Sequence, residues 1–464
     1  MVTLMIILFL IGYACIALEH NLKVNKAAPA LLLASLLWTI YIYYAQAYLP
    51  SVEEFIAFNA GSSDITHNVI HYVTETQIIE HVGDVAEILF FLMGAMTIVE
   101  LIDVHGGFSI ITDKITTKSK KKLLWTLSII TFFMSAILDN LTTTIVMVML
   151  LRKLVADKKE RWLFACSIIM AANSGGAFSP IGDVTTIMLW VKGNVTTQHL
   201  IPSLIGPSIL SAFVPILCIS FLLKGELQAV TEEKTQRTLS TCDIITPFEQ
   251  KFIFFLGVGC LIFVPIFKSI THLPPFLGIL LGLGLLWIYT EKMYGRKRNV
   301  PESSKARISV ILGRIDFTTI LFFLGILMSV AALQCAGILH ELSLFLEEKF
   351  HNIYLINILI GVLSSIVDNV PLVAGAMGMY EIAPAGCEAS LVPFMQDGTF
   401  WLFLSYCAGV GGSILIIGSA AGVVVMGLEK VDFVWYLKHI SFFALLGYLA
   451  GALFFILQET FILG

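Results

Sequence analysis

The sequence predicts an all-α polytopic membrane protein with two inverted repeats, each containing one re-entrant hairpin and one broken helix. Three observations support this fold class: an apolar composition, many apolar segments, and an internal repeat whose flanking charges change sign. Of the 464 residues, 57% are hydrophobic and 13% are charged. Soluble domains have about 25% charged residues, so a cytosolic protein is excluded. The net charge of −5 argues against nucleic-acid binding.

Apolar segments occur along the whole chain, and the length allows about a dozen spans. The first segment, 2–18, lacks a basic start and is expected to be a retained helix rather than a signal peptide. The polar stretch 51–84, between the segments 27–49 and 86–102, is predicted to be an external surface helix. Residues 1–85 are predicted to form an N-terminal scaffold. The segments after the first are 27–49, 86–102, 123–138, 141–151, 162–172, 184–191, 203–223, 252–269, 276–290, 316–338, 353–367, 371–380, 399–428 and 434–462.

The first predicted hairpin has its tip at 139–140. Segments 123–138 and 141–151 are separated only by Asp139 and Asn140, which suggests a pair that enters and leaves the membrane on one side. Both flanks are basic and should therefore be cytoplasmic. The flanking cations are Lys114, Lys118, Lys120, Lys121, Lys122, Arg152, Lys153, Lys158, Lys159 and Arg161.

The second predicted hairpin has its tip at 368–369, between segments 353–367 and 371–380. Its flanks are acidic and should face outside. The two hairpins would therefore enter from opposite sides, with both chain termini external. The flanking acids are Glu341, Glu347, Glu348, Glu381, Glu388 and Asp397, against a single Lys349.

Three sequence blocks recur in the same order and with nearly the same spacing. With the reversal of charge, they predict inverted repeats over 86–223 and 316–464, joined by cytoplasmic linkers and connecting helices over 224–315. This arrangement is typical of secondary transporters, whose site lies near the membrane midplane, and a channel is less favoured. The paired blocks are 89–92 with 321–324, 135–140 with 364–369, and 175–182 with 411–418.

Each repeat also contains a predicted broken helix, at 173–183 and at 409–419. The first break contains three glycines and Pro180, which should loosen the helix. Non-helical backbone at membrane depth must line a cavity or be covered by protein. The side chains expected to contribute ligand oxygens there are Asn173, Ser174, Ser179, Ser413 and Ser419.

Asp139, Asp183 and Asp368 should all lie deep in the membrane, where each aspartate costs roughly 2.5 to 3.5 kcal/mol. The breaks contain no Lys or Arg to pair with them. Their natural partners are therefore Na⁺, Li⁺ or protons, with amide and hydroxyl oxygens completing the site. Competition between a cation and protons for the same carboxylates would be sufficient for antiport. The alternative is that these aspartates only cap half-helices.

The oxygen ligands next to the hairpin tips are expected to be Asn140, Asn369 and the hydroxyl of Thr142. Asp139, Asn140 and Asp183 form the predicted Na⁺ site. The threonine hydroxyl could instead bond back to its own helix.

Glu100 lies near the cytoplasmic end of the segment 86–103. It could accept protons on an inner path, or it could be a solvated acid at a helix end. The eight cysteines lack metal-ligand spacing, so no cofactor is expected.

The blocks at 87–100, 139–144 and 179–183 resemble the NhaD-type Na⁺/H⁺ antiporters of the ion transporter superfamily. The resemblance covers nearly the whole chain. It implies a non-enzymatic carrier that exchanges Na⁺ or Li⁺ for H⁺, with an elevator-like movement, a homodimer, a role in pH homeostasis and a bacterial cytoplasmic (inner) membrane location. By this similarity, ions and protons bind at Asp139, Asn140, Asp183, Asp368 and Asn369.

Two other functions fit the sequence less well. A Na⁺-coupled carboxylate or oxyanion carrier of the same superfamily would carry a neutral Ser-Asn-Thr-like tip, whereas both tips here read Asp-Asn. Buried carboxylates would repel a dicarboxylate. An intramembrane aspartyl protease also uses two buried aspartates, but Pro180 stands where its motif around Asp183 requires glycine, and Leu138 precedes the other aspartate.

Overall fold

The chain forms an all-α structure, as the sequence predicted. The computed structural model describes residues 1–17, 22–59, 64–112, 117, 119–223, 225–226, 245–297, 305, 307–350, 352–366 and 368–463. Within these ranges every element longer than a single bridge is a helix. Lys114 and Lys118, which helped to orient the first hairpin, lie outside the described residues.

Eight helices in the described part of the chain are long and apolar enough to cross a membrane. The protein is therefore an integral multi-pass membrane protein. The eight are α3 (Ala27–Tyr48), the continuous helix Ile65–Val104, α8 (Lys120–Leu138), α12 (Thr197–Leu222), α13 (Pro247–Thr271), α14 (Pro275–Arg296), α16 (Phe317–Cys335) and the helix Ser441–Phe461, which begins as α23 (Ser441–Gln458).

The shorter apolar helices are the first helix and those next to the predicted tips and breaks. They are α1 (Val2–Ala17), α9 (Asn140–Leu154), α18 (Ile353–Leu363), α19 (Asn369–Met379), α20 (Thr399–Gly411) and α21 (Ala420–Glu429).

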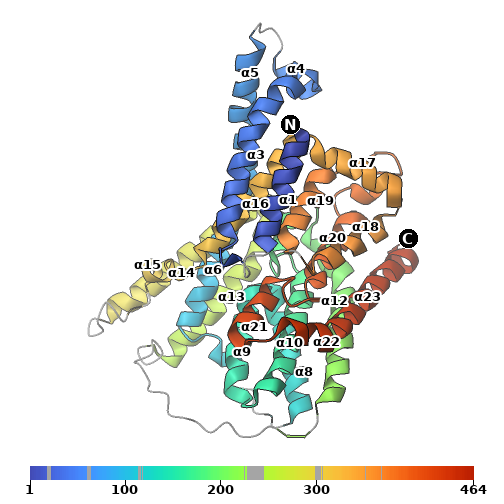
Figure 1. The fold of residues 1–464 in the computed structure, drawn as a ribbon. Coiled ribbons are helices and arrows are strands. Elements are labelled where there is room, and N and C mark those ends of the chain that lie inside the picture. Colours follow the sequence, from blue (N-terminus) through green and yellow to red (C-terminus); the bar gives the residue numbers. More distant parts are fainter. Residues whose placement is uncertain are drawn as a thin grey trace. The chain divides into compact units, whose positions relative to one another are not determined.

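The chain divides into two compact units. The first unit comprises Met1–Phe90, Asp316–Ile356 and Val370–Ala383. In it α1 packs on α3, and α3 packs on α16 (Figure 1). The indole Nε1 of Trp38 donates to the carbonyl oxygen of Met328 at 2.9 Å, which fixes α3 against α16. Also in this unit, α17 (Ile338–Phe350) follows α16.

The prediction of one surface helix over 51–84 is wrong. α4 (Glu53–Phe58) is short, and α5 (Ile65–His71) continues through the π-helical turn Tyr72–Gln77 into α6 (Ile78–Val104). The polar residues of this stretch lie on one side, while Val69, Tyr72 and Val73 are buried. Apolar residues on one face are sufficient to extend the helix, and polar composition alone concealed them.

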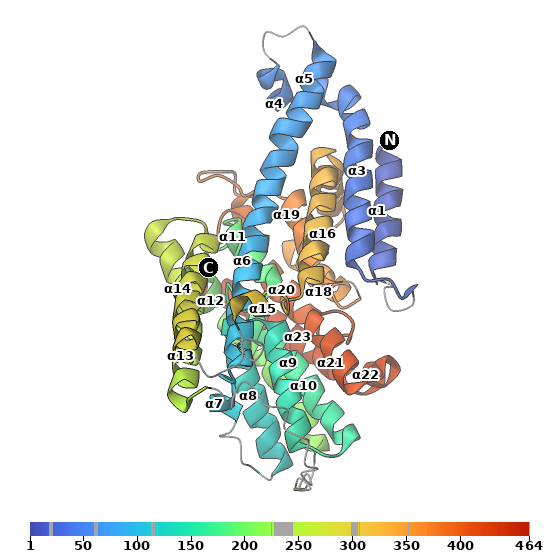
Figure 2. The same cartoon turned by 90° about the vertical axis from the view of Figure 1, so that its left-hand side faces the viewer.

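The second unit comprises Phe91–Ile315, Asn357–Asn369 and Pro384–Gly464, and it is built around α10 (Lys158–Ala177). Every residue of α10 from 164 to 177 is buried. α10 packs against α8, α9, α12, α20 and α21 (Figure 2). The unit also contains α7 (Ser109–Thr112), α11 (Val184–Val191), α15 (Ile308–Ile311), α22 (Phe433–His439) and the π-helical end Glu459–Leu463.

Equivalent glycines of the two sequence repeats occupy equivalent close contacts. A side chain at Gly175 of α10 would clash with the carbonyl oxygen of Phe132 in α8. A side chain at Gly411 of α20 would clash in the same way with the carbonyl oxygen of Gly361 in α18. The repeat in sequence therefore corresponds to a repeat in packing within the second unit.

Equivalent serines also make equivalent hydrogen bonds. Ser135 Oγ donates to the carbonyl oxygen of Ala172 at 2.6 Å, and Ser364 Oγ donates to that of Ala408 at 2.9 Å. Each bond joins a hairpin helix to the helix that leads into the break of the same repeat.

The breaks are shorter than the predicted ranges 173–183 and 409–419. α10 remains helical to Ala177 and α20 to Gly411, so the segments outside regular helices are 178–183 and 412–419. Gly175 and Gly176 were expected to loosen α10, but both are helical. At Gly175 the missing side chain serves close packing instead.

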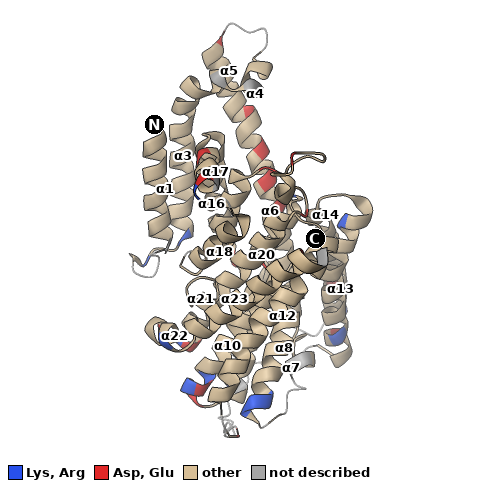
Figure 3. Cartoon of the chain, turned by 90° about the vertical axis from the view of Figure 1, so that its right-hand side faces the viewer, with Lys and Arg blue, Asp and Glu red and all other residues tan. Residues whose placement is uncertain are grey.

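Basic residues gather at one end of the second unit. Figure 3 shows Lys and Arg at the starts of α8 and α10. Lys120 of α8 forms an ion pair with Glu160 of α10 at 2.5 Å. This end is the one that the sequence predicts to be cytoplasmic.

The turn that follows α11, the second half of the first broken helix, is held by the loop that precedes α20. Gln396 Nε2 donates to the carbonyl oxygen of Gly193 at 2.7 Å, just beyond α11. Thr196 Oγ1 donates to Asp397 Oδ2 at 2.8 Å, and its backbone N–H donates to Asp397 Oδ1 at 2.5 Å. A loop of the second repeat thus binds the end of a helix of the first.

Candidate ion-binding site

Asp139 forms the tip between α8 and α9. Its φ of 82° is left-handed, which is unusual for any residue other than glycine. Its carboxylate accepts the backbone N–H of Thr142 at 2.8 Å and the Thr142 hydroxyl at 2.9 Å. The carboxylate therefore caps α9, and the hydroxyl proposed as a ligand is bonded to Asp139.

Asp183 caps α11 with one oxygen and faces the first tip with the other. Its Oδ1 accepts the backbone N–H and the hydroxyl of Thr185, both at 3.0 Å. Its Oδ2 accepts from Asn140 Nδ2 at 2.8 Å. The backbone N–H of Asn140 also donates to the carbonyl oxygen of Gly182 at 3.0 Å. The tip and the first break are therefore joined through both backbone and side chain.

A buried chain of amides and hydroxyls continues from Asn140 to the second break. Asn140 Nδ2 donates to Asn173 Oδ1 at 3.2 Å. Asn173 Nδ2 donates to Ser413 Oγ at 2.9 Å and to Ser419 Oγ at 2.8 Å. Ser419 in turn caps α21. We call Asp183, Asn140, Asn173, Ser413 and Ser419 the buried polar network; each is at most 5% exposed.

The other two aspartates lie close enough to Asp183 to act on it. Asp183 interacts electrostatically with both Asp139 and Asp368. Asn369 is 5% exposed at the start of α19. Within the described ranges, however, no three His, Cys, Asp or Glu residues are grouped closely enough to hold one metal ion. A cation bound here would take mixed ligands, with carboxylate oxygen supplemented by neutral oxygens.

Two candidate serines lie outside the buried polar network. Ser174 Oγ accepts from the hydroxyl of Ser211 at 2.9 Å, on the side of α10 that faces α12. Ser179 Oγ donates to the carbonyl oxygen of Ala136 in the hairpin. Both hydroxyls connect backbone elements around the site.

Glu100 lies in α6, away from the buried polar network. Its carboxylate is 3.9 Å from Arg314 Nη1, and its side chain is 29% exposed. It also interacts with the nearby Asp103. These contacts are those of a partly exposed acid near the end of α6, and a role of Glu100 in a proton path stays a prediction.

The capping alternative is realised at both first-repeat aspartates. A helix N-terminus carries partial positive charge, which favours the ionised carboxylate. An ionised carboxylate has about four lone-pair sites. Capping therefore leaves other lone pairs of the carboxylate available, and Asp183 Oδ2 uses one of them to accept from Asn140 Nδ2.

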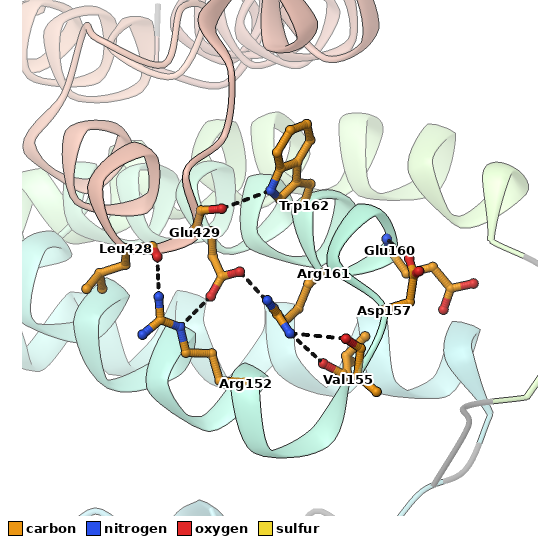
Figure 4. Close-up of polar contacts among 9 residues, drawn as sticks. Arg152, Val155, Asp157, Glu160, Arg161, Trp162, Leu428 and Glu429 are labelled. Atoms are coloured by element: carbon orange, nitrogen blue, oxygen red, sulfur yellow. Dashed lines mark hydrogen bonds and ion pairs between the residues drawn. The ribbon is translucent and has the colours of Figure 1, made fainter. Parts of the chain in front are cut away.

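The sequence did not single out Glu429, at the end of α21. Its side chain is fully buried and pairs with Arg152 and Arg161 (Figure 4). The available signal was a glutamate that ends a long apolar segment, followed by Lys430. Its two partners lie 277 and 268 residues away in the sequence.

Comparison with known proteins identifies the family. A family model described as citrate transporter matches residues 6–396. Sodium/proton antiporter 2 of Arabidopsis thaliana is 42% identical, with 98% of this chain and 100% of the relative covered. Sodium/proton antiporter 1 of the same plant is 45% identical, with 96% and 71% covered.

A bacterial relative has a lower sequence identity. The Na⁺/H⁺ antiporter NhaD of Alkalimonas amylolytica is 30% identical, with 92% of this chain and 84% of the relative covered. The family and these relatives are transporters, which agrees with the expected non-enzymatic role. The chain therefore belongs to the citrate transporter family and, within it, to the NhaD-type Na⁺/H⁺ antiporters.

Proposed function

We propose that this protein exchanges Na⁺ or Li⁺ for H⁺ across a membrane. The observation that carries the proposal is the position of Asp183, which is 2% exposed and bonded to the first tip through Asn140. The residues that act on it are neutral or acidic: Thr185, Asn140, Asp139 and Asp368. A buried carboxylate in such surroundings is stabilised by a cation or by a proton. The names of the antiporter relatives support the same exchange.

Competition at Asp183 Oδ2 would couple the two ions. Na⁺ at this oxygen would draw its other ligands from Asn140, Asn173 and the Asp139 carboxylate. A proton on Oδ2 removes the negative charge and makes this oxygen a hydrogen-bond donor, which weakens it as the acceptor of the Asn140 amide. The same oxygen cannot hold both, so binding one ion releases the other.

The transport cycle follows from that competition. With the site open to the outside, Asp139 and Asp183 take up protons and release Na⁺. The part of the chain that carries the site then moves in an elevator-like step, the protons leave to the cytoplasm, and Na⁺ binds the vacated oxygens. We also propose a homodimer that serves pH homeostasis. For a bacterial source, the proposed location is the cytoplasmic (inner) membrane. The relatives also include plant proteins.

A Na⁺-coupled carboxylate carrier is the second candidate, because the matching family model carries the name citrate transporter. The charge at the site favours the antiporter. Two or three carboxylates near the midplane would repel an anionic substrate unless several cations neutralised them.

The deciding experiment uses purified protein in liposomes with an imposed pH difference and a pH-sensitive dye. Na⁺, Li⁺, K⁺, citrate, succinate and arsenite are added in turn. We expect Na⁺ or Li⁺ to dissipate the pH difference. Accumulation of citrate or succinate without cation–proton exchange would overturn the proposal.

The same liposomes test competition. The apparent KM for Na⁺ should rise as the pH falls, because protons occupy the oxygens that Na⁺ needs. An apparent KM that is constant over two pH units would contradict a shared site.

A further inference from the structure

We propose that Glu429, Arg152 and Arg161 form a positioning cluster that sets the Na⁺ affinity of the site at a distance. This inference rests on the proposed function. None of the contacts described for these three residues reaches a side chain of the network. They join the far ends of the helices that contain Asn140 and Asn173 and of the helix that Ser419 caps.

The cluster is centred on one buried carboxylate. Arg152 Nε lies 2.6 Å from Glu429 Oε1, and Arg161 Nε lies 2.7 Å from Glu429 Oε2. The Glu429 side chain is fully buried, whereas those of Arg152 and Arg161 are 40% and 19% exposed. Each carboxylate oxygen thus has its own guanidinium partner, which fixes the orientation of the carboxyl group.

The two arginines and the neighbouring Trp162 also bind backbone carbonyl groups at the ends of α21 and α9. Arg152 Nη2 donates to the carbonyl oxygen of Leu428, and Trp162 Nε1 donates to that of Glu429 at 3.0 Å. Arg161 Nη1 donates to the carbonyl oxygen of Val155 at 3.2 Å, in the turn between α9 and α10. Carbonyl groups at a helix C-terminus lack helical partners and favour such cations. Figure 4 shows this arrangement.

Each helix joined by the cluster reaches the buried polar network at its other end. α9 begins at Asn140 and contains Arg152, α10 begins near Arg161 and contains Asn173, and α21 begins after Ser419 and ends at Glu429. A helix rises about 1.5 Å per residue. The ten residues of α21 therefore transmit a shift at Glu429 to Ser419 over about 15 Å.

The hydrogen bonds of Asn173 would register such a shift. Asn173 links α10 to the second break, because its Nδ2 donates to Ser413 Oγ at 2.9 Å and to Ser419 Oγ at 2.8 Å. A displacement of α21 by a fraction of an ångström lengthens the bond to Ser419 and frees the Asn173 amide to turn. Since Asn173 also accepts from Asn140, the change reaches the group that bonds Asp183.

The test compares Glu429→Gln, Glu429→Asp and Arg152→Gln with the wild type in the Na⁺-dependent liposome assay. For Glu429→Gln we expect the apparent KM for Na⁺ to rise about tenfold, with a maximal rate within about twofold of the wild type. Glu429→Asp should recover part of the affinity because it restores the charge. Arg152→Gln should raise KM about threefold, since Glu429 keeps Arg161.

Glu291→Gln is the matched control. Glu291 pairs with Arg307 in the same unit, but both side chains are about one third exposed, and an exposed pair contributes little. Its KM should equal that of the wild type. If Glu429→Gln does not accumulate in membranes, Arg152→Gln, which changes an exposed side chain, decides by the same measurement.

The outcomes separate the two proposals. A wild type that exchanges no cation for protons refutes the proposed function itself. A wild type that exchanges them, together with cluster variants of unchanged KM, refutes the positioning role alone. A fall in maximal rate at constant KM would also refute it, because that result indicates loss of folded protein or slower movement instead of an altered site.

Discussion

The two broken helices differ in charge while sharing the same backbone. Asp183 precedes α11 with φ −146° and ψ 147°, and Ser419 precedes α21 with φ −142° and ψ 154°. Both side chains accept a backbone N–H of the helix they cap. Only Asp183 adds a carboxylate, and its second oxygen faces Asn140. Both breaks therefore keep the capping geometry, while the carboxylate that the proposed cation site requires is present at Asp183 and replaced by a hydroxyl at Ser419.

Removing the charge of Asp183 tests this difference between the breaks most directly and should have the largest effect. In Asp183→Asn, the side-chain oxygen can still cap α11, but an amide would then face the Asn140 amide. We expect exchange to fall at least 100-fold, measured as Na⁺-dependent dye dequenching in inverted vesicles. Asp64→Asn, which changes an exposed aspartate that caps α5 to an equally good capping residue, should remain near wild type. Normal exchange in Asp183→Asn would refute the assignment.

Asp139→Asn should have the next largest effect. Asparagine tolerates a positive φ better than most residues, so the backbone at φ 82° and the cap of α9 should survive. The lost charge acts on Asp183 from the tip, and Asp139 is only half-buried. We expect exchange to fall about 30- to 100-fold in the same vesicles. An unchanged Na⁺ dependence would show that the tip carboxylate only caps its helix.

Asn173→Ala tests the connection between the two breaks. It removes the amide that bonds Asn140, Ser413 and Ser419. We expect the apparent KM for Na⁺ to rise about tenfold in liposomes. Asn357→Ala removes another buried asparagine, which bonds the carbonyl oxygen of Phe400, and should leave KM unchanged. Equal effects of the two substitutions would mean that packing, not the network, is responsible.

Ser419→Ala should have the smallest effect. Loss of an N-cap costs about 1 kcal/mol of stability, while Asn173 keeps its bond to Ser413. We expect the thermal midpoint to fall by a few degrees and the KM for Na⁺ to rise by up to about tenfold, as in Glu429→Gln, since both changes weaken the bond between Asn173 and Ser419. Ser174→Ala, a buried serine outside the network, serves as control. A loss as large as that of Asp183→Asn would remove the asymmetry between the breaks.

The sequence predicts the all-α class and the approximate positions of the tips and breaks, because charges within apolar segments are easily recognised. It also predicts Asn140, Asn173 and Asp183 as candidates, and the structure brings these three together. It does not predict Glu429 with its arginines, since no periodicity connects residues so far apart in the chain. It also misjudges Gly175, because a glycine that loosens a helix and a glycine that allows close packing cannot be distinguished in the sequence.

Residues in each half of the chain bind helix ends in the other half. Gln396 and Asp397 bind the turn after α11 and the start of α12, and Arg152, Arg161 and Trp162 bind the end of α21. Each repeat therefore completes a helix end that belongs to the other. Neither half of the chain therefore completes these helix ends alone, although the two breaks themselves differ in Asp183 and Ser419.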